Sequence, residues 1–444
     1  MPRQIVIQLA RFGDILQTGR LLRALELEGE THLCVDQSLV PLARRLHPRC
    51  EVHGIAAHAD GRKLDANLFA ELLSVNRRAC AELTGLAADA VYNLNHSPLN
   101  FALASLFPSE KVRGYCVENG QVLRERWMRF AFRWAALRRA APLNLVDFWG
   151  LLAPSPAPAD VVNPPALSGG KGIGVVLAGR QARRSLPPDV LAPMVLALFE
   201  GLGGRPVFLL GGRTERGIAR RLMDHLPGHV LSRTLNLAGR TDWDGLCDAL
   251  TGLDLVLSPD TGTMHLAARL GVPVFGLFLS SAWTWETGPY GRGHRVWQAD
   301  APCAPCRESQ ECCNDLACLA PFRDPAMLRA LFHEAATLVE AGRCGLPAER
   351  IGNPPGLVLV ESGFDELGLI WTPRHETVMS GMGDEAGGTS ETRRRVLRAL
   401  LAEFAFAQGK IQRRPDGFAP DQALCAENFY YEADWMLPDM GVVS

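Results

Sequence analysis

The sequence predicts an α/β protein built from two doubly wound, Rossmann-like domains and a small C-terminal extension. The chain has 444 residues, more than the roughly 250–300 residues at which a single hydrophobic core stops growing. Short apolar runs alternate with helix-like segments in both halves, which is typical of parallel sheets covered by helices. Polar residues follow several of these runs, at the place where parallel sheets bind ligands.

The domain boundary is predicted in the segment 152–171, which is rich in Pro, Ala, Ser and Gly. Such a composition does not favour a persistent helix or strand, and it is typical of interdomain linkers. We therefore assign residues 1–153 to the first domain, 154–172 to the linker, 173–345 to the second domain and 346–444 to the extension.

The composition excludes several classes of protein. With 47% hydrophobic residues, 21% charged residues and a net charge of −2, the chain is neither a disordered protein nor a nucleic-acid-binding protein. It has no apolar run of about 18 residues, and its first residues lack the apolar core of a signal peptide. We therefore expect a cytoplasmic protein.

The first domain is expected to begin with a strand over 4–9 and a helix over 15–25, joined by a loop that contains Arg11, Gly13 and Asp14. Gly13 suits the tight turn, and Asp14 then lies in the first helical turn at the carboxyl end of the strand. The helix dipole alone would also favour an Asp there. Further strands are expected at 31–36 and 90–94, and further helices at 39–46 and 68–83.

Three other polar residues of this domain each have two interpretations. His96 follows the strand over 90–94, where it could hydrogen-bond a sugar or satisfy a loop carbonyl. Arg62 and Lys63 lie in a Gly-containing loop. They are either solvated charges or an anchor for an anionic acceptor.

A basic, aromatic helix is predicted over 121–140. It contains six arginines and one glutamate, interleaved with aromatic residues. One interpretation is an amphipathic helix that packs in the domain. The other is a helix that adsorbs to an anionic membrane or to the phosphates of a lipid.

The second domain contains the stretch with the clearest chemistry, from Leu253 to Phe278. It predicts a strand over 253–257, a helix that begins near Thr261 and ends at Gly271, and a second strand over 272–278. The turn Asp260-Thr261-Gly262-Thr263 lies at the carboxyl end of the first strand, where a helix N-terminus binds phosphate. His265 follows one turn into the helix, beside this anion site.

Earlier elements of the second domain are a strand over 173–178, a helix over 188–202 and a strand over 206–210. Between the first strand and the helix, a loop contains Arg180 and Arg184, among other arginines. Clustered guanidinium groups could bind a diphosphate through forked hydrogen bonds, although an exposed arginine loop is the alternative.

The string from Asp260 to Pro273 resembles the signature of glycosyltransferase family 9, the lipopolysaccharide heptosyltransferases. The sequence Gly-Pro-Tyr-Gly at 288–291 and the segment 11–25 are similar to other motifs of this family. The resemblance covers residues 4–340 and implies a GT-B fold, which consists of two Rossmann-like domains.

The resemblance implies an inverting glycosyltransferase that moves a sugar, a heptose, from a nucleotide diphosphate donor such as ADP-heptose to an anionic glycolipid of the lipopolysaccharide core. Asp14 matches the general base, and Glu215 matches an acid on the donor nucleoside side. The amides of Thr261 to Thr263, His265, Arg180 and Arg184 would bind the donor. No metal cofactor is needed for catalysis, and peripheral association with the inner membrane is compatible with the acceptor.

Two departures from the family pattern affect the donor loop. The family usually has a Lys three residues before Pro187 and a Trp just before it, whereas this chain has Arg184 and Leu186. On the acceptor side the resemblance favours Arg11, Gly13, Arg62, Lys63 and His96. A binding protein without turnover and a nucleotide-sugar epimerase of the same fold are the alternative functions.

A cysteine cluster follows the last predicted strand of the second domain. The cluster has three interpretations: a metal site, reduced structural thiols or disulfides. Its C-x-x-C sequence is half of a zinc site, but the spacing of the other cysteines is irregular for the second half. Its members are Cys303, Cys306, Cys312, Cys313 and Cys318.

The extension is expected to contain a hairpin over 356–371, a flexible linker over 381–388, a helix over 391–408 and an irregular tail. The tail carries the aromatic residues Phe429, Tyr430, Tyr431 and Trp435.

Overall fold

The computed structural model describes residues 1–57, 66–118, 121–124, 127–128, 138–177, 184–306, 311–340, 352–374 and 390–412. The chain divides into two compact units. Unit 1 consists of residues 1–137, 145–158 and 398–444, and unit 2 consists of residues 138–144 and 159–397. Each unit is a doubly wound α/β domain, as the sequence predicts.

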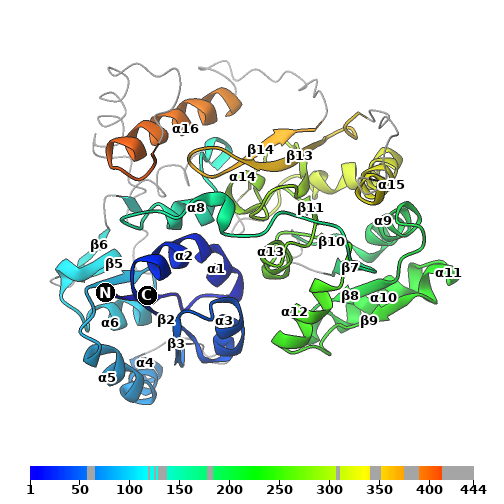
Figure 1. Ribbon diagram of the computed structural model, residues 1–444. Helices are drawn as coiled ribbons and strands as arrows, with labels where there is room; N and C mark the ends of the chain where they lie inside the picture. Colours follow the sequence, from blue (N-terminus) through cyan, green and yellow to red (C-terminus); the bar gives the residue numbers. More distant parts are fainter. Residues whose placement is uncertain are drawn as a thin grey trace. The chain divides into compact units, whose positions relative to one another are not determined.

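Unit 1 is built on a sheet with the strand order β3-β2-β1-β4-β5-β6 (Figure 1). Its strands are parallel except for β6, which pairs with β5 antiparallel. They are β1 (Arg3–Ile7), β2 (Glu30–Asp36), β3 (Glu51–Ile55), β4 (Ala90–Asn93), β5 (Val112–Glu118) and β6 (Gln121–Arg124). The chain order reverses between β1 and β4, which makes this pair the topological switch point of the sheet.

The helices of unit 1 are α1 (Phe12–Gln17), α2 (Gly19–Glu28), α3 (Val40–Leu46), α4 (Ala66–Val75), α5 (Arg77–Gly85), α6 (Pro98–Ala104) and α8 (Leu145–Gly150). The predicted long helix over 68–83 is wrong in one respect, because α4 and α5 are separated at Asn76. The buried Asn76 side chain bonds both the amide and the carbonyl of Ala56. This local bonding competes with the helix backbone and ties the break to the end of β3.

Unit 2 repeats this arrangement in the order β14-β13-β12-β11-β10-β7-β8-β9. Strands β7 to β12 are parallel, and the β13–β14 hairpin is attached antiparallel to β12. The strands of this sheet are β7 (Ile173–Val176), β8 (Val207–Leu210), β9 (Thr234–Asn236), β10 (Leu255–Ser258), β11 (Val274–Phe278), β12 (Arg295–Ala299), β13 (Leu357–Phe364) and β14 (Leu369–Pro373). The switch point of this sheet lies between β7 and β10.

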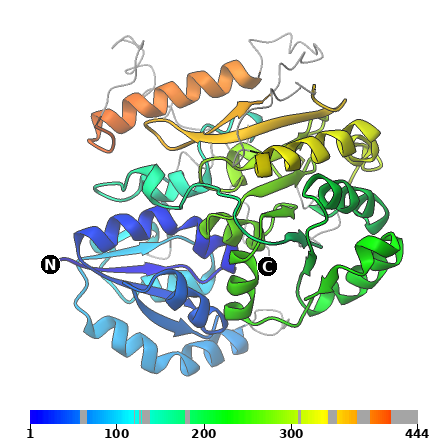
Figure 2. The ribbon, with the colours of Figure 1, turned by 45° about the vertical axis from the view of Figure 1, so that its right-hand side comes forward.

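The helices of unit 2 are α9 (Pro188–Gly201), α10 (Arg216–His225), α11 (Gly228–Leu231), α12 (Trp243–Thr251), α13 (Gly262–Arg269), α14 (Thr284–Thr287) and α15 (Pro325–Glu340). Helices α9 and α15 pack side by side, as both ribbon views show (Figure 2). Gly201 is required at this contact, because a Cβ atom there would lie 2.6 Å from the carbonyl oxygen of Phe332.

The C-terminal hairpin is confirmed, but it is part of the second sheet rather than a separate element. The predicted helix over 391–408 is confirmed as α16 (Ser390–Ala407), and the division between the two units falls within it. The predicted linker at 381–388 and the aromatic residues from 429 to 435 lie outside the described residues. Across the part of the chain that the structure describes, no helix is long and apolar enough to cross a membrane.

The predicted helix over 121–140 is wrong at its start, because residues 121–124 form strand β6. Trp127 and Met128 are buried, and the Trp127 indole donates a hydrogen bond to the carbonyl of Phe148 and stacks on Phe404. These two residues therefore pack in unit 1. Residues 125–126 and 129–137, including Arg126, Arg129 and Arg133, lie outside the described residues.

Candidate functional site

The turn predicted to bind an anion lies at the switch point of the second sheet, directly after β10. Thr261 caps α13, because its backbone is extended and its hydroxyl accepts a hydrogen bond from the Met264 amide at 3.3 Å. Gly271 ends the helix with a φ of +75°, a conformation that favours glycine. The first-turn amides of Gly262 and Thr263 have no preceding helical turn to bind, which suits an anion.

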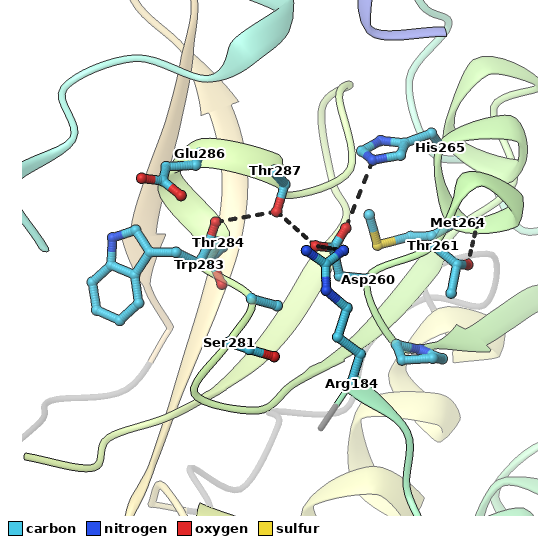
Figure 3. A network of polar contacts seen from close by, with 12 residues as sticks. Arg184, Asp260, Thr261, Met264, His265, Ser281, Trp283, Thr284, Glu286 and Thr287 are labelled. Atoms are coloured by element: carbon cyan, nitrogen blue, oxygen red, sulfur yellow. Dashed lines mark hydrogen bonds and ion pairs between the residues drawn. The ribbon is translucent and has the colours of Figure 1, made fainter. Parts of the chain in front are cut away.

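Asp260 is the centre of a polar network at the start of this turn (Figure 3). Its side chain is only 4% exposed. Arg184 forms an ion pair with it at 3.0 Å, and the Thr287 hydroxyl donates to the same carboxylate oxygen, also at 3.0 Å. A buried carboxylate needs such partners, because desolvation otherwise costs several kcal/mol.

His265 faces the other oxygen of Asp260, with 3.8 Å between its Nε2 atom and that oxygen. The imidazole is buried on the first turn of α13, as the spacing of the motif predicts. Arg184 reaches the same carboxylate from the β7–α9 connection, on the other side of the switch point. Two residues far apart in the sequence therefore meet where doubly wound sheets bind nucleotides.

A second ion pair lies next to this network and was missed by sequence reasoning. Arg138 binds both carboxylate oxygens of Glu286, with Nε to Oε1 at 3.1 Å and Nη2 to Oε2 at 2.6 Å. It also donates to the carbonyl of Cys306. Burial opposes the charged form of Arg138, but the hydrogen bonds and charge of Glu286 outweigh it, so the pKa of Arg138 is raised.

The neighbouring Arg139 donates to the carbonyls of Ala301, Ala304 and Pro302. Both Arg138 and Arg139 are therefore bonded within unit 2. For these two residues the structure favours the packing interpretation of the segment 121–140, because Glu286 and loop carbonyls accept their hydrogen bonds. The sequence gave no local signal for these contacts, because the bonded residues lie about 150 residues apart in the chain.

Glu215 lies at the end of β8, in the short 3₁₀ helix η6 (Arg213–Glu215). One carboxylate oxygen accepts from the Gly212 amide at 2.6 Å, and the other accepts from the Thr214 hydroxyl at 2.7 Å. Glu215 thus closes a capping turn, and no contact joins it to Asp260. Arg180 lies outside the described residues.

The Gly-Pro-Tyr-Gly motif at 288–291 is part of the scaffold. Tyr290 is buried against Phe364, and a Cβ atom on Gly288 would lie 2.3 Å from the ring of Trp371. Thr287, which directly precedes the motif, contacts Asp260. Close packing around Gly288 therefore holds α14 and its Thr287 hydroxyl near the switch point.

In unit 1, the corresponding switch point carries Asp14. This residue is partly exposed in the first turn of α1, and its carboxylate accepts a hydrogen bond from the Arg11 amide at 3.0 Å. Arg11 is exposed and Gly13 is partly exposed in the same loop. The carboxylate is therefore fixed by its own helix start at the carboxyl end of β1.

The other side of this switch point is the loop after β4. The Asn95 side chain accepts from the Leu9 amide at 2.9 Å, which ties this loop to the β1 loop. His96 is exposed and contacts the rings of Phe101 and Tyr115 edge to face. Arg62 and Lys63 lie outside the described residues.

The cysteine cluster surrounds one cavity of about 270 Å³ beside Ser280 and Ser281. The five cysteines from 303 to 318 line it together with Glu311, and none of these five described cysteines forms a disulfide. Within the described ranges, the cluster His32, Glu51 and His53 is the one whose ligand atoms lie within 4.8 Å of one another. In the described part of the chain, no three of these five sulfur atoms lie that close to one another.

The fold and the site define a protein with two Rossmann-like domains, the second of which has the capped N-terminal turn of α13 at its switch point. Residues 197–316 match the model of glycosyltransferase family 9 (heptosyltransferase). The resemblance seen in the sequence is thereby confirmed over this segment, which contains the string from Asp260 to Pro273.

Two curated proteins share short segments with the chain. A lipopolysaccharide heptosyltransferase 1 from Pseudomonas aeruginosa is 38% identical over 96 residues, which are 22% of this chain and 25% of that protein. A lipopolysaccharide core heptosyltransferase, OpsX, from Haemophilus influenzae is 46% identical over 43 residues, 10% of this chain and 12% of that protein. These matches therefore span a quarter or less of each relative.

Among solved structures, the E. coli ADP-heptose lipopolysaccharide heptosyltransferase II has a similar fold. The TM-score is 0.51 at 16% identity, and the match covers 75% of this chain and 99% of that chain. This similarity supports the GT-B fold of two Rossmann-like domains.

Proposed function

We propose that the protein is an inverting glycosyltransferase that transfers a heptose from ADP-heptose to the lipopolysaccharide core or a related anionic glycolipid. The observation that carries this proposal is the turn at Asp260 to Thr263, located at a switch point and flanked by Arg184 and His265. The relatives support the choice of sugar, since their names describe heptosyltransferases and one of them names ADP-heptose.

In this proposal the donor diphosphate binds the amides of Thr261 to Thr263. Arg184 and Arg180 neutralise the negative charge that develops as the diphosphate leaves, and His265 donates a hydrogen bond. Glu215 binds on the nucleoside side. Fixed donors aimed at a developing charge lower the barrier without reorganising during the reaction.

The reaction requires one proton transfer and one substitution. Asp14 takes the proton from the acceptor hydroxyl, whose oxygen attacks the anomeric carbon on the face opposite the leaving group. The bond between that carbon and the phosphate oxygen breaks, and the nucleoside diphosphate leaves with the electron pair. Arg11, Gly13, Arg62, Lys63 and His96 would position the acceptor. Arginine and amide groups supply the positive charge, so this mechanism needs no metal.

The test is to incubate the purified chain with ADP-heptose, with and without a lipopolysaccharide-core glycolipid, and to measure ADP and glycosylated lipid. We expect ADP to be released in step with glycosylation. Saturable donor binding without ADP release would identify a binding protein instead. Epimerised donor without glycosylation would identify an epimerase, and either result would contradict the proposal.

We also propose that the segment with Arg126, Arg129 and Arg133 keeps the enzyme at an anionic membrane surface. This proposal rests on the excess of arginine over acidic residues in the segment 121–140. Each basic residue near such a surface contributes about 1 kcal/mol. Changing these three residues to Gln should therefore reduce co-sedimentation with anionic vesicles and raise the acceptor KM.

The binding to vesicles should also weaken with salt, because the Debye length is about 10 Å at 0.1 M. Changing Arg77 and Arg78, which begin α5 in the same unit, to Gln is a control that should leave vesicle binding as it is. Vesicle binding that is indifferent to salt, or equal in the triple variant, would contradict a membrane role.

A further inference from the structure

A cluster of two histidines and two glutamates lies at the amino ends of β2 and β3. Asp14 lies at the opposite end of this sheet, after the carboxyl end of β1. The sequence Glu-x-His begins both strands, as Glu30-Thr-His32 in β2 and Glu51-Val-His53 in β3. The parallel register places Glu51 directly beside His32. Since every second residue points to the same face of a strand, the repeat brings the four side chains together.

Two imidazole nitrogens and one carboxylate oxygen of this cluster lie close together. The Nδ1 atom of His32 lies 3.0 Å from Nε2 of His53 and 3.6 Å from Oε2 of Glu51. The three ligand atoms of His32, Glu51 and His53 lie within 4.8 Å of one another. On the opposite side of its ring, Nε2 of His32 lies 3.1 Å from Oε1 of Glu30.

Glu30 determines which nitrogen of His32 carries the proton. A carboxylate only accepts hydrogen bonds, so the contact with Glu30 places the proton on Nε2 of His32. The Nδ1 lone pair is then aimed toward His53 and Glu51. Glu30 is itself held by Arg3, whose Nε atom donates to Oε2 at 2.8 Å.

A hydrogen bond between the two imidazoles would leave part of this arrangement unexplained. If Nε2 of His53 donates to Nδ1 of His32, the carboxylate of Glu51 still faces a lone pair 3.6 Å away. A cation placed among the three atoms would attract all of them. A carboxylate that orients a histidine from behind is also the usual partner of a metal-bound imidazole.

The distances fit a small tetrahedral ion. With zinc bonded to nitrogen and oxygen at about 2.0–2.2 Å, neighbouring ligand atoms of a tetrahedron lie roughly 3.3–3.6 Å apart. The observed separations of 3.0 and 3.6 Å are close to this range. Two imidazoles favour zinc and similar transition metals over Mg²⁺ or Ca²⁺, which prefer oxygen ligands.

We propose that His32, His53 and Glu51 bind a zinc ion or a similar divalent transition metal, with Glu30 positioning His32. His32 is buried, whereas the Glu51 side chain is 63% exposed, which leaves a route for the ion and room for a water as fourth ligand. Because β3 is an edge strand, the metal would fasten this edge to β2. The metal would therefore have a structural role, because it lies at the opposite end of the strands from Asp14.

The test is a calorimetric titration of the chelator-treated full chain with Zn²⁺. We expect His53→Gln and Glu51→Gln each to bind one equivalent fewer than the wild-type chain. The cysteine cavity could take up zinc as well, so the result is the difference between variants rather than the total. Substitution with Co²⁺ separates the two sites, because thiolate ligands give a charge-transfer band that nitrogen and oxygen ligands do not.

Glu30→Gln tests the positioning role. Loss of such a partner typically costs about 10–100-fold in metal affinity, and we expect that loss with the stoichiometry unchanged. Glu28→Gln is the matched control, two residues away and outside the cluster, and it should bind zinc like the wild-type chain.

Equal stoichiometry and affinity in the wild-type chain, His53→Gln and Glu51→Gln would overturn the proposal and leave a hydrogen-bonded pair. Circular dichroism in the presence of chelator shows whether each variant folds. If His53→Gln does not fold, the exposed Glu51 decides the question, because its replacement removes a ligand without disturbing the core.

Discussion

The switch points of the two sheets carry aspartates in very different surroundings. Asp14 in unit 1 is partly exposed, and its carboxylate accepts a hydrogen bond from the backbone of its own helix start. Asp260 in unit 2 is buried, and Arg184, Thr287 and His265 converge on it from other segments. The same strand order thus supports an accessible carboxylate in one unit and a fixed polar network in the other.

This difference suggests a division of labour. A partly exposed carboxylate can receive a proton from a substrate, whereas a buried, ion-paired carboxylate holds its neighbours in place. Substitutions at the two switch points should therefore separate catalysis from donor binding.

The largest effect is expected at the first switch point. Asp14→Asn removes the proposed base and keeps the shape, so kcat should fall by about 10²–10⁴-fold while the donor Kd stays the same. Steady-state kinetics and calorimetry measure the two quantities. The control is Asp89→Asn, which replaces an exposed aspartate directly before β4 in the same unit. Near-normal turnover by Asp14→Asn would remove Asp14 from the mechanism.

The next effect concerns the stability of unit 2 in acid. His294 is fully buried beside β11, and burial lowers its pKa to about 3. The unfolded chain binds the proton near pH 6.5, so stability should fall as the pH decreases from about 6.5 toward 3. This one group should contribute a loss of about 1.4 kcal/mol per pH unit within that window.

His294→Asn removes this term and should flatten the acid side of the stability profile, as measured by urea unfolding at several pH values. His225→Asn replaces an exposed histidine of α10 and should keep the wild-type slope. Identical slopes for the wild-type chain and His294→Asn would show that burial of His294 does not drive the acid sensitivity.

A smaller effect is expected from Arg184→Lys. Lysine keeps the positive charge but lacks the planar fork of arginine, so donor affinity should decrease by about tenfold, or roughly 1.4 kcal/mol. Fluorescence titration with ADP measures this change. Arg205→Lys alters another arginine paired with an aspartate in the same unit and should leave ADP affinity unchanged. If both variants bind ADP equally well, Arg184 does not contact the donor.

The sequence predicted the parts of the fold that depend on local patterns. The strands β1, β2, β4, β7, β8, β10 and β11 follow from apolar runs, and α13 follows from Thr261 and Gly271. Strands β3 and β12 did not stand out: β3 is short and polar at its start, and β12 contains the buried Arg295 and Gln298. Their place in the sheets depends on neighbours distant in the sequence.

The predicted helix over 121–140 was wrong at its start, because a four-residue edge strand has no reliable period. The exposed Val122 and Leu123 gave no alternation of buried and exposed positions. The candidate site was predictable where its residues lie close together in the sequence, as Asp260 to His265 do. Thr287 and the Arg138–Glu286 pair could not be found in this way, because only the folded sheet brings them to the switch point.

The most direct test of the account is ADP binding to Gly262→Val, measured by calorimetry. Branched side-chain atoms at residue 262 should keep phosphates away from the first-turn amides of α13. Each hydrogen bond to a charged group contributes about 1.5–3 kcal/mol, so losing two of them should weaken binding by more than about 100-fold. Gly217→Val, at a site in α10 where a Cβ meets open space, should bind ADP normally. ADP affinity in Gly262→Val equal to that of the wild-type chain would contradict a donor site at this turn.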